Sequence, residues 1–191
     1  MKTDRNHRAE TTTQPETAAW DVVVCGGGPA GCAAAVLAAQ HGARTLLVER
    51  YAHLGGMATG ARVSSFCDSP GGPVFDELLS RLTAVGAAAV RVDRERYRDP
   101  GRHRYEPEMV KAVLMEMAME AGVEVLLDTL ACEALVQGNR VVGVRAAGKG
   151  GLTVFPASVT IDATADADIA AAAGAAFHQG DPEDGRLQHC N

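Results

Sequence analysis

The chain has 191 residues, of which 47% are hydrophobic and 22% charged, a composition typical of a globular protein with a core of its own. Its formal net charge of −6 argues against a general nucleic-acid or membrane-surface binder. No apolar run reaches the ~18 residues that a membrane span requires.

The first nineteen residues are polar and lack the apolar core of a signal peptide, so residues 1–19 are predicted to be a disordered tail. Reduced structural thiols in a cytosol are favoured, because the cysteines form neither a CxxC pair nor a metal-ligand spacing. The cysteines are Cys25, Cys32, Cys67, Cys132 and Cys190. We expect a cytoplasmic protein.

Residues 21–50 predict a strand, a glycine-rich turn, a helix and a second strand, in that order. The β-branched run Val22–Val24 precedes the turn, small apolar residues fill 30–39, and the apolar run Leu46–Val48 follows. This βαβ order is typical of a dinucleotide-binding domain.

The glycines of this turn have separate expected roles. Gly26 allows a tight exit from the strand, Gly28 leaves no Cβ between the backbone and a pyrophosphate, and Gly31 lets the helix lie close to the sheet. Because the first N–H groups of a helix lack acceptors within it, an anion belongs at the turn. Pro29 fits at the helix start, where a missing N–H costs little.

Glu49 lies 18 residues beyond Gly31 (49 − 31), where an acid that binds a ribose hydroxyl is expected. Its carboxylate would repel a ribose phosphate, which favours FAD or NAD over NADP.

The region after Glu49 predicts a loop, a helix and a polar stretch. Gly55, Gly56 and Gly60 indicate a flexible loop on the cofactor side of the sheet, and a helix is expected over 75–85. Residues 91–104 carry six arginines interleaved with acids. They are interpreted as a solvated hairpin or loop in preference to a grip on an acidic substrate.

A helix is predicted over 107–121 with Gly122 as its C-cap, because apolar residues recur there at helical spacing. Strands follow at 123–127, 130–136, 141–144 and 152–155, so a small antiparallel meander is expected after the helix, and a short buried run is expected at 159–161.

Three acids follow that run. Asp166 and Asp168 are placed to complement the N-terminus of a last helix. Capping is favoured over metal binding by Asp162, Asp166 and Asp168, so no metal site is predicted.

The assembled order resembles the FAD-dependent oxidoreductases with a glutathione-reductase-type FAD domain. More narrowly, it resembles the group related to the flavoprotein subunits of succinate dehydrogenase and fumarate reductase. The matching segments are CGGGPAGCAAAVLAAQHGARTLLVER, LGGMATG, YEPEMVKAVLMEMAMEAGVEVLL and VTIDATADADIAAAAGA, between Asp21 and Gly174. Thiazole-forming enzymes share a GGGPAG-like start, without an assignable counterpart of their active site.

The resemblance implies an α/β fold: a Rossmann-like FAD/NAD(P)-binding domain with a parallel sheet, a β-meander crossover and a partial inserted substrate domain. The FAD-binding domain would comprise 20–62 and 107–170, the inserted segment 63–106, and 171–191 the start of a further substrate-domain segment. The chain would then be an N-terminal portion of a flavoprotein, or half of a split one, completed by a C-terminal segment or a second chain.

The resemblance also implies FAD-binding positions along the chain. The pyrophosphate would be held by Gly26, Gly28, Pro29, Ala30 and Gly31. In the adenosine, Glu49 would bind the ribose, Arg50 would lie beside the adenine and the backbone of Ala131 would contact the adenine. Gly55, Gly56 and Met57 would line the path toward the flavin ring.

Ala163, Thr164 and Ala165 occupy the place of the family's Ala-Thr-Gly turn, and the resemblance implies that Ala163 binds the cofactor there. The alanine at 165 is expected to crowd the backbone if that turn requires a positive φ.

The function expected is a FAD-dependent oxidoreductase that passes a hydride or electron pair between an unidentified small-molecule substrate and the flavin. The alternatives are a non-catalytic FAD- or nucleotide-binding fragment that needs a partner chain, and a FAD-dependent monooxygenase. No residue is assigned as a general acid or base; His53, Cys67, His103 and His178 are candidates by residue type alone.

Overall fold

The computed structural model describes residues 19–61, 63, 65–66, 71–90 and 103–187. The predicted tail up to residue 18 and the arginine-rich stretch at 91–102 lie outside these ranges. Within them the elements are β1 (Trp20–Cys25), α1 (Pro29–Gln40), β2 (Thr45–Val48), η1 (Gly56–Ala58), β3 (Ser65–Phe66), α2 (Pro73–Ala84), β4 (Ala88–Val90), β5 (His103–Tyr105), α3 (Pro107–Ala121), β6 (Glu124–Leu126), β7 (Leu130–Gln137), β8 (Arg140–Gly148), β9 (Gly151–Asp162) and α4 (Asp168–Ala172).

The larger sheet brings three strand ends to one edge. Its strands lie in the order β6-β2-β1-β9-β8-β7, and β6, β2, β1 and β9 run parallel. Cys25, the last residue of β1, pairs with Val48 of β2 and with Asp162 of β9. The segments that follow these strands therefore meet at the carboxyl edge, where α/β sheets bind ligands.

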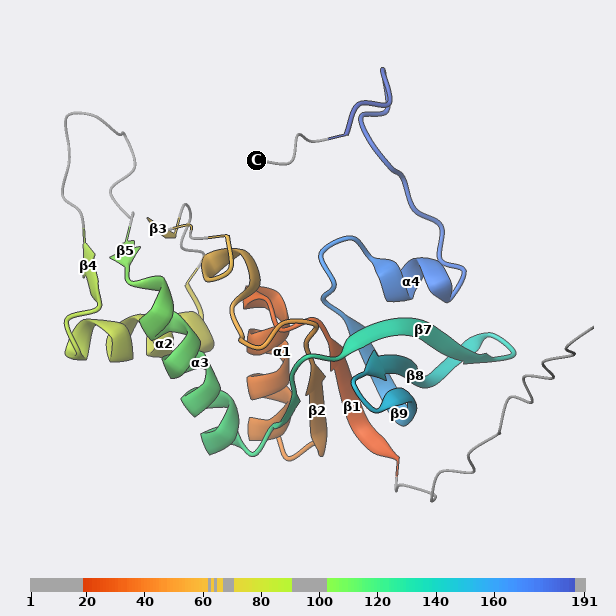
Figure 1. Ribbon diagram of the computed structural model, residues 1–191, viewed down its shortest axis with the longest axis horizontal. Coiled ribbons are helices and arrows are strands. Elements are labelled where there is room, and N and C mark those ends of the chain that lie inside the picture. Colours follow the sequence, from red (N-terminus) through yellow and green to blue (C-terminus); the bar gives the residue numbers. More distant parts are fainter. Residues whose placement is uncertain (1–18, 62, 64, 67–70, 91–102, 188–191) are drawn as a thin grey trace, which may run out of the picture.

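Helices α1, α2 and α3 lie on one side of the parallel strands β6, β2 and β1, and the meander β7–β8–β9 folds over their other side together with α4 (Figure 1). Val24 and Leu47 belong to the core beneath α1, α2 and α3, whereas Val23 and Leu46 belong to a second core with Val144 of the meander. This division follows from the strand period, because successive side chains point to opposite faces. The predicted α/β fold with a parallel sheet and a meander is confirmed.

Strand β9 corrects one prediction. Separate runs were expected at 152–155 and 159–161, but β9 is one continuous strand. It pairs with β8 up to Pro156 and with β1 from Ala157 onward. Proline lacks an N–H, so it fits where a strand exchanges one neighbour for another. Val159, expected to be buried, is 51% exposed.

A second, smaller sheet lies between β2 and α3 in the order of the chain. Strands β3, β5 and β4 lie in that order, and α2 packs on α3 through its buried residues Val74, Leu78 and Leu82. Helix α2 begins two residues before the predicted start at 75 and α3 has its predicted bounds. Gly122 caps α3 in the left-handed conformation, as predicted (φ 84°).

Candidate functional site

At the junction of β1 and α1, Gly26 and Gly31 lie where a side chain would meet backbone atoms, whereas Gly28 leaves open space. Gly26 has φ +101°, and a Cβ there would lie 2.3 Å from the carbonyl oxygen of Ala163. A Cβ on Gly31 would lie 1.8 Å from the carbonyl oxygen of Gly26. By contrast, no atom lies within 4 Å of the Cβ position of Gly28. Glycine at 28 therefore relieves no clash and leaves open space.

Helix α1 begins at Pro29 without a side-chain cap. Gly28 occupies the N-cap position with an extended backbone, and among the described residues no side chain hydrogen-bonds to the helix start. The first turn of α1 contains no acidic residue. The N–H groups of this turn and the positive end of the helix dipole are therefore available to an anion.

Glu49 is 5% exposed, and backbone N–H groups hold its carboxylate. Oε2 accepts the N–H of Gly27 at 2.5 Å, and Oε1 accepts the N–H of Tyr51 at 2.8 Å. These charge-assisted bonds fix the carboxylate just after β2. Each oxygen keeps acceptor capacity, so the group can bind a further hydroxyl.

The loop that carries η1 is hydrogen-bonded to the glycine turn and packs against it. The N–H of Gly55 donates to the carbonyl of Gly27 at 2.8 Å. A Cβ on Gly56 would lie 2.9 Å from the Cα of Gly28, so the two backbones touch. Met57, within η1, is 68% exposed. The loop predicted here thus contains a short helical turn.

Asp162 organises the turn between β9 and α4. Its Oδ1 accepts the N–H of Thr164 at 3.0 Å and the hydroxyl at 2.7 Å, and its Oδ2 accepts the N–H of Ala170 at 2.7 Å. Burial opposes ionisation of Asp162, but these hydrogen bonds outweigh it and lower its pKa. Asp168 lies in the first turn of α4 as predicted, and the N–H groups of this turn donate to side chains that precede the helix, Asp168 to Thr164 and Ala170 to Asp162.

Ala165 lies in this turn with φ +77°, and Ala167 follows with φ +58°. The turn therefore does adopt the conformation that favours glycine, and an alanine there is strained by roughly 1 kcal/mol.

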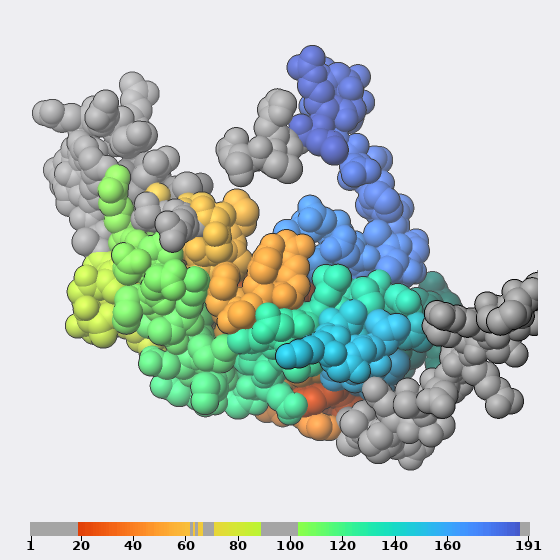
Figure 2. Space-filling model, in the orientation of Figure 1, coloured from red at the N-terminus to blue at the C-terminus, as the bar shows by residue number. Residues whose placement is uncertain are grey.

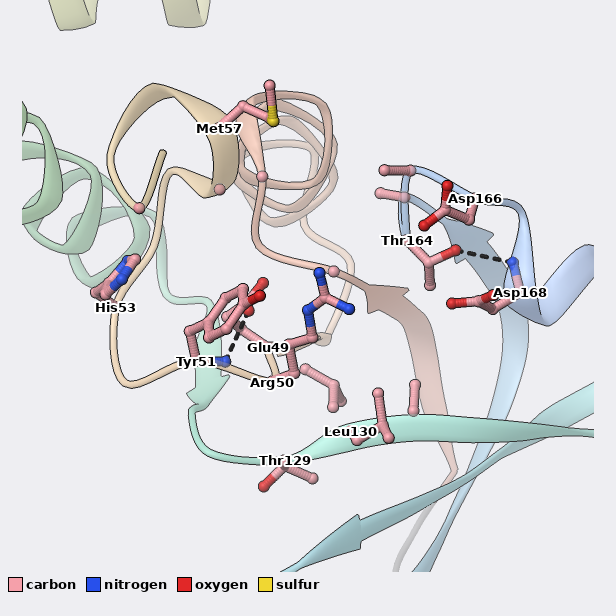
Figure 3. A pocket seen from close by; sticks show the side chains of 18 of the residues that line it. Glu49, Arg50, Tyr51, His53, Met57, Thr129, Leu130, Thr164, Asp166 and Asp168 are labelled. Atoms are coloured by element: carbon pink, nitrogen blue, oxygen red, sulfur yellow. Dashed lines mark hydrogen bonds between the residues drawn. The ribbon is translucent and has the colours of Figure 1, made fainter. Parts of the chain in front are cut away.

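A cavity of about 580 Å³ lies at this carboxyl edge, within the range of ~300–1,000 Å³ typical of small-molecule sites. Figure 2 shows the molecule hollowed between the orange loop after β2 and the blue segment after β9. Figure 3 shows the side chains around the hollow. The lining residues are Gly26, Gly28, Val48, Glu49, Arg50, Tyr51, His53, Gly56, Met57, Gly60, Ala61, Thr129, Leu130, Ala131, Ala163, Thr164, Ala165, Asp166 and Asp168.

Most of the predicted cofactor residues line this cavity, and their binding roles stay predictions. The others lie next to it. Gly31 and Gly55 are buried against the glycine turn, while Pro29 and Ala30 are exposed at the start of α1.

Tyr51 and Thr129 line the cavity without having been predicted from the sequence. Tyr51 lies two residues after Glu49, so its position beside an expected ribose-binding acid was a usable signal. Thr129 reaches the site because its N–H donates to the carbonyl of Glu49 at 2.9 Å. That contact joins distant segments, so no local pattern indicates it.

Of the acid–base candidates chosen by residue type, His53 lines the cavity. His103 lies in β5 of the small sheet, His178 is exposed after α4, and Cys67 lies outside the described residues. Within the described ranges no three His, Cys, Asp or Glu side chains form a group that could hold a metal ion. No helix in the same ranges has the length and apolar character needed to cross a membrane.

Cys25 and Cys32 lie beside the glycine turn, and their thiols are expected to be unreactive. Burial, together with the nearby charge of Asp162, raises the pKa of Cys25 to about 12. Burial also raises the pKa of Cys32 to about 12. Both thiols are therefore protonated at neutral pH and serve as small apolar side chains.

Comparison with known proteins gives a family match over most of the chain. The family model described as FAD dependent oxidoreductase matches residues 21–190.

Individual relatives share part of their length with this chain. A thiamine thiazole synthase of Aeropyrum pernix is 35% identical over 130 residues, which cover 65% of this chain and 42% of that protein. Digeranylgeranylglycerophospholipid reductase 1 of Methanopyrus kandleri is 33% identical over 153 residues, which cover 75% and 39%. The chain thus spans about two fifths of the length of these relatives.

Among solved structures, Thermovibrio ammonificans THI4 superposes with a TM-score of 0.59 at 22% identity, covering 80% of this chain and 60% of that one. This similarity shows that the two chains share a fold.

Proposed function

The chain belongs to the family of FAD-dependent oxidoreductases, and we propose that it is the FAD-binding part of an enzyme that passes a hydride or electron pair between a small-molecule substrate and the flavin. One observation carries the proposal: the uncapped start of α1, the buried carboxylate of Glu49 and the turn after β9 meet at a single cavity.

The groups present at this cavity fit FAD. The N–H groups at the start of α1, with the open space beside Gly28, suit a diphosphate. The fixed carboxylate of Glu49 suits the hydroxyls of the neighbouring ribose and disfavours a phosphate there. The proposed contacts are Gly26, Gly28, Pro29, Ala30, Gly31 and Ala163 for the diphosphate, Glu49, Arg50 and Ala131 for the adenosine, and Gly55, Gly56 and Met57 toward the flavin.

FAD supplies two-electron redox chemistry to such a site, and the protein binds and orients the cofactor. In this chain two backbone segments that contact each other would orient the cofactor: the glycine turn and the loop that carries η1. The hydrogen bond from Gly55 to Gly27 holds these segments together, so the diphosphate and the path toward the flavin ring would keep one relative placement.

The narrower kinship with succinate dehydrogenase and fumarate reductase flavoprotein subunits stays a prediction, as do the domain limits and the cytoplasmic location. The relatives include a thiazole synthase and a lipid reductase, which differ in substrate, so we propose a redox enzyme without naming its substrate. A second chain or a further segment that completes the FAD domain is part of the same proposal.

Reconstitution of the purified chain with FAD tests the proposal. Bound flavin should remain after desalting, absorb near ~450 nm and bleach on reduction. A chain that retains no flavin favours an incomplete fragment that needs its missing segment, and a chain that binds NAD in place of FAD contradicts the proposed cofactor. The alternative of a non-catalytic FAD-binding part predicts bound flavin that small-molecule donors do not reduce, and the monooxygenase alternative predicts oxygen consumption.

A further inference from the structure

Three side chains that follow Glu49 form a stack along the cavity wall. The Cζ of Arg50 lies 4.8 Å from the centroid of the Tyr51 ring. The rings of Tyr51 and His53 are stacked, with centroids 5.8 Å apart and an interplanar angle of 11°. Figure 3 shows the Tyr51 ring between His53 and Arg50. We call Arg50, Tyr51 and His53 the Arg–Tyr–His stack; all three line the cavity.

The backbone anchors the middle of this stack. The N–H of Tyr51 donates to Glu49 at 2.8 Å, and the carbonyl of Tyr51 accepts the N–H of Asp128 at 3.2 Å. The Tyr51 backbone is thus held on both sides, although the residue is 48% exposed. Since the residue is half exposed, burial of the ring contributes little to this arrangement, and the contacts with His53 and Arg50 are the ones that position it.

His53, at one end of the stack, is held by the loop that carries η1. The Nδ1 of His53 lies 3.3 Å from the carbonyl oxygen of Leu54 and 3.3 Å from the hydroxyl of Thr59. The loop that carries η1 therefore holds His53 against Tyr51, and Tyr51 in turn limits where the Arg50 guanidinium can lie.

The order of the strands gives an order of subsites along the cavity. Gly28 follows β1, Glu49 follows β2 and Thr129 follows β6, and these strands are neighbours in the order β1, β2, β6. With a diphosphate at Gly28 and a ribose at Glu49, the base of the same nucleotide lies next along the edge. There the cavity is lined by Arg50, Thr129, Leu130 and Ala131.

We propose that the Arg–Tyr–His stack is a positioning device for base recognition, in which Tyr51 and His53 hold the guanidinium plane of Arg50 for stacking on a purine. The inference rests on the proposed function, because it takes the nucleotide placement from it. A guanidinium stacks on aromatic rings through either face, so one face can rest on Tyr51 while the other meets the base. Arg50 contacts the ligand, and Tyr51 and His53 act through Arg50.

Binding of ADP and UDP to the full chain, measured by calorimetry, isolates the base, because the two ligands share ribose and diphosphate. The wild type should prefer ADP. Tyr51→Leu, which removes the ring, should weaken ADP binding about three- to tenfold and leave UDP binding unchanged, as expected for loss of a cation–π contact. Tyr51→Phe keeps the ring and should retain the wild-type preference, and His53→Leu should reduce it in part.

Each result bears on the stack. An unchanged ADP-to-UDP ratio in Tyr51→Leu, or an equal loss for both ligands, overturns the proposal. Thermal unfolding without nucleotide shows whether Tyr51→Leu is folded, and His53→Leu supplies the comparison if it is not. A wild type that binds FAD but shows no effect of either variant overturns the stack alone. A wild type that binds neither ADP nor FAD has no base site for the stack to serve, which overturns the stack together with FAD binding by this chain alone.

Discussion

The carboxylate of Glu49 and the backbone N–H of Gly27 are joined by a 2.5 Å hydrogen bond that links the ends of β2 and β1 across the candidate site. The other oxygen of Glu49 binds the N–H of Tyr51. The same carboxylate therefore holds the glycine turn in place and faces the cavity. Stability and ligand binding are coupled at this residue.

Glu49→Gln should affect both properties. The amide presents an NH₂ group to one of the two backbone donors, so the free energy of unfolding should fall by about 1–3 kcal/mol, the cost of a buried donor left unpaired. FAD affinity should fall about tenfold or more with the lost charge. Urea unfolding and flavin titration measure the two effects.

Glu133→Gln is the matched control, because Glu133 forms an exposed ion pair with Arg145 at 2.6 Å. This variant should change stability by less than ~1 kcal/mol. Glu49→Gln with wild-type stability and affinity would remove Glu49 from the proposed site.

Substitution by alanine should reduce FAD affinity at Gly28 and stability at Gly31. Gly28→Ala places its methyl group in open space at an ordinary φ of −68°, so stability should stay within ~0.5 kcal/mol of the wild type. FAD affinity should nevertheless fall about tenfold or more, because the methyl stands between the backbone N–H groups and the diphosphate.

Gly31→Ala should instead cost about 3 kcal/mol or more, because its Cβ would lie 1.8 Å from the Gly26 carbonyl oxygen. Urea unfolding of both variants, with flavin titration of Gly28→Ala, measures the contrast. Full affinity in Gly28→Ala would place the diphosphate elsewhere.

Ala165→Gly should stabilise the protein by about 0.5–1 kcal/mol, because the left-handed backbone at φ +77° strains an alanine and suits glycine. Ala112→Gly is the control: Ala112 is exposed in α3, where glycine costs about 1 kcal/mol. Opposite signs for the two variants in urea unfolding are the expected result. A loss of stability in Ala165→Gly would show that the turn relaxes without cost.

Cys25 and Cys32 should resist alkylation in the native protein, whereas the exposed Cys132 should react. Burial raises the pKa of Cys25 and Cys32 to about 12 from the ordinary value of 9.0, and the thiolate is the reactive form. Iodoacetamide treatment at about pH 8, followed by peptide mass spectrometry, checks this. Labelling of Cys32 before unfolding would contradict the burial.

The same raised pKa values have a consequence for stability at high pH. The pKa of each thiol is higher in the folded protein than in the unfolded chain, so the folded state favours the protonated form. The contribution of the two thiols to the free energy of unfolding is therefore complete below about pH 9 and is lost as the pH rises toward about 12. Cys25→Ala should therefore make the free energy of unfolding fall less steeply across this window. Urea unfolding at several pH values measures the slope, and an unchanged slope would assign the alkaline loss to other groups.

Local patterns in the sequence were sufficient to predict a large part of the fold. The run of apolar residues at helical spacing and Gly122 together predict α3 with its observed bounds, because both signals act within a few turns of the helix. The glycine turn and Glu49 were likewise found from spacing alone. Strand β9 was predicted as two separate runs, because its exchange of β8 for β1 after Pro156 depends on partner strands that no local pattern indicates.

The sequence by itself determined the βαβ unit, the acid after its second strand and the α/β class, since each depends on residues close together in the chain. Only the tertiary structure decided that Thr129 joins Glu49, that Asp162 accepts an N–H of α4, and that Arg50, Tyr51 and His53 stack. The physical reason is that strand order and register choose which distant segments meet, and side-chain packing then selects the contacts.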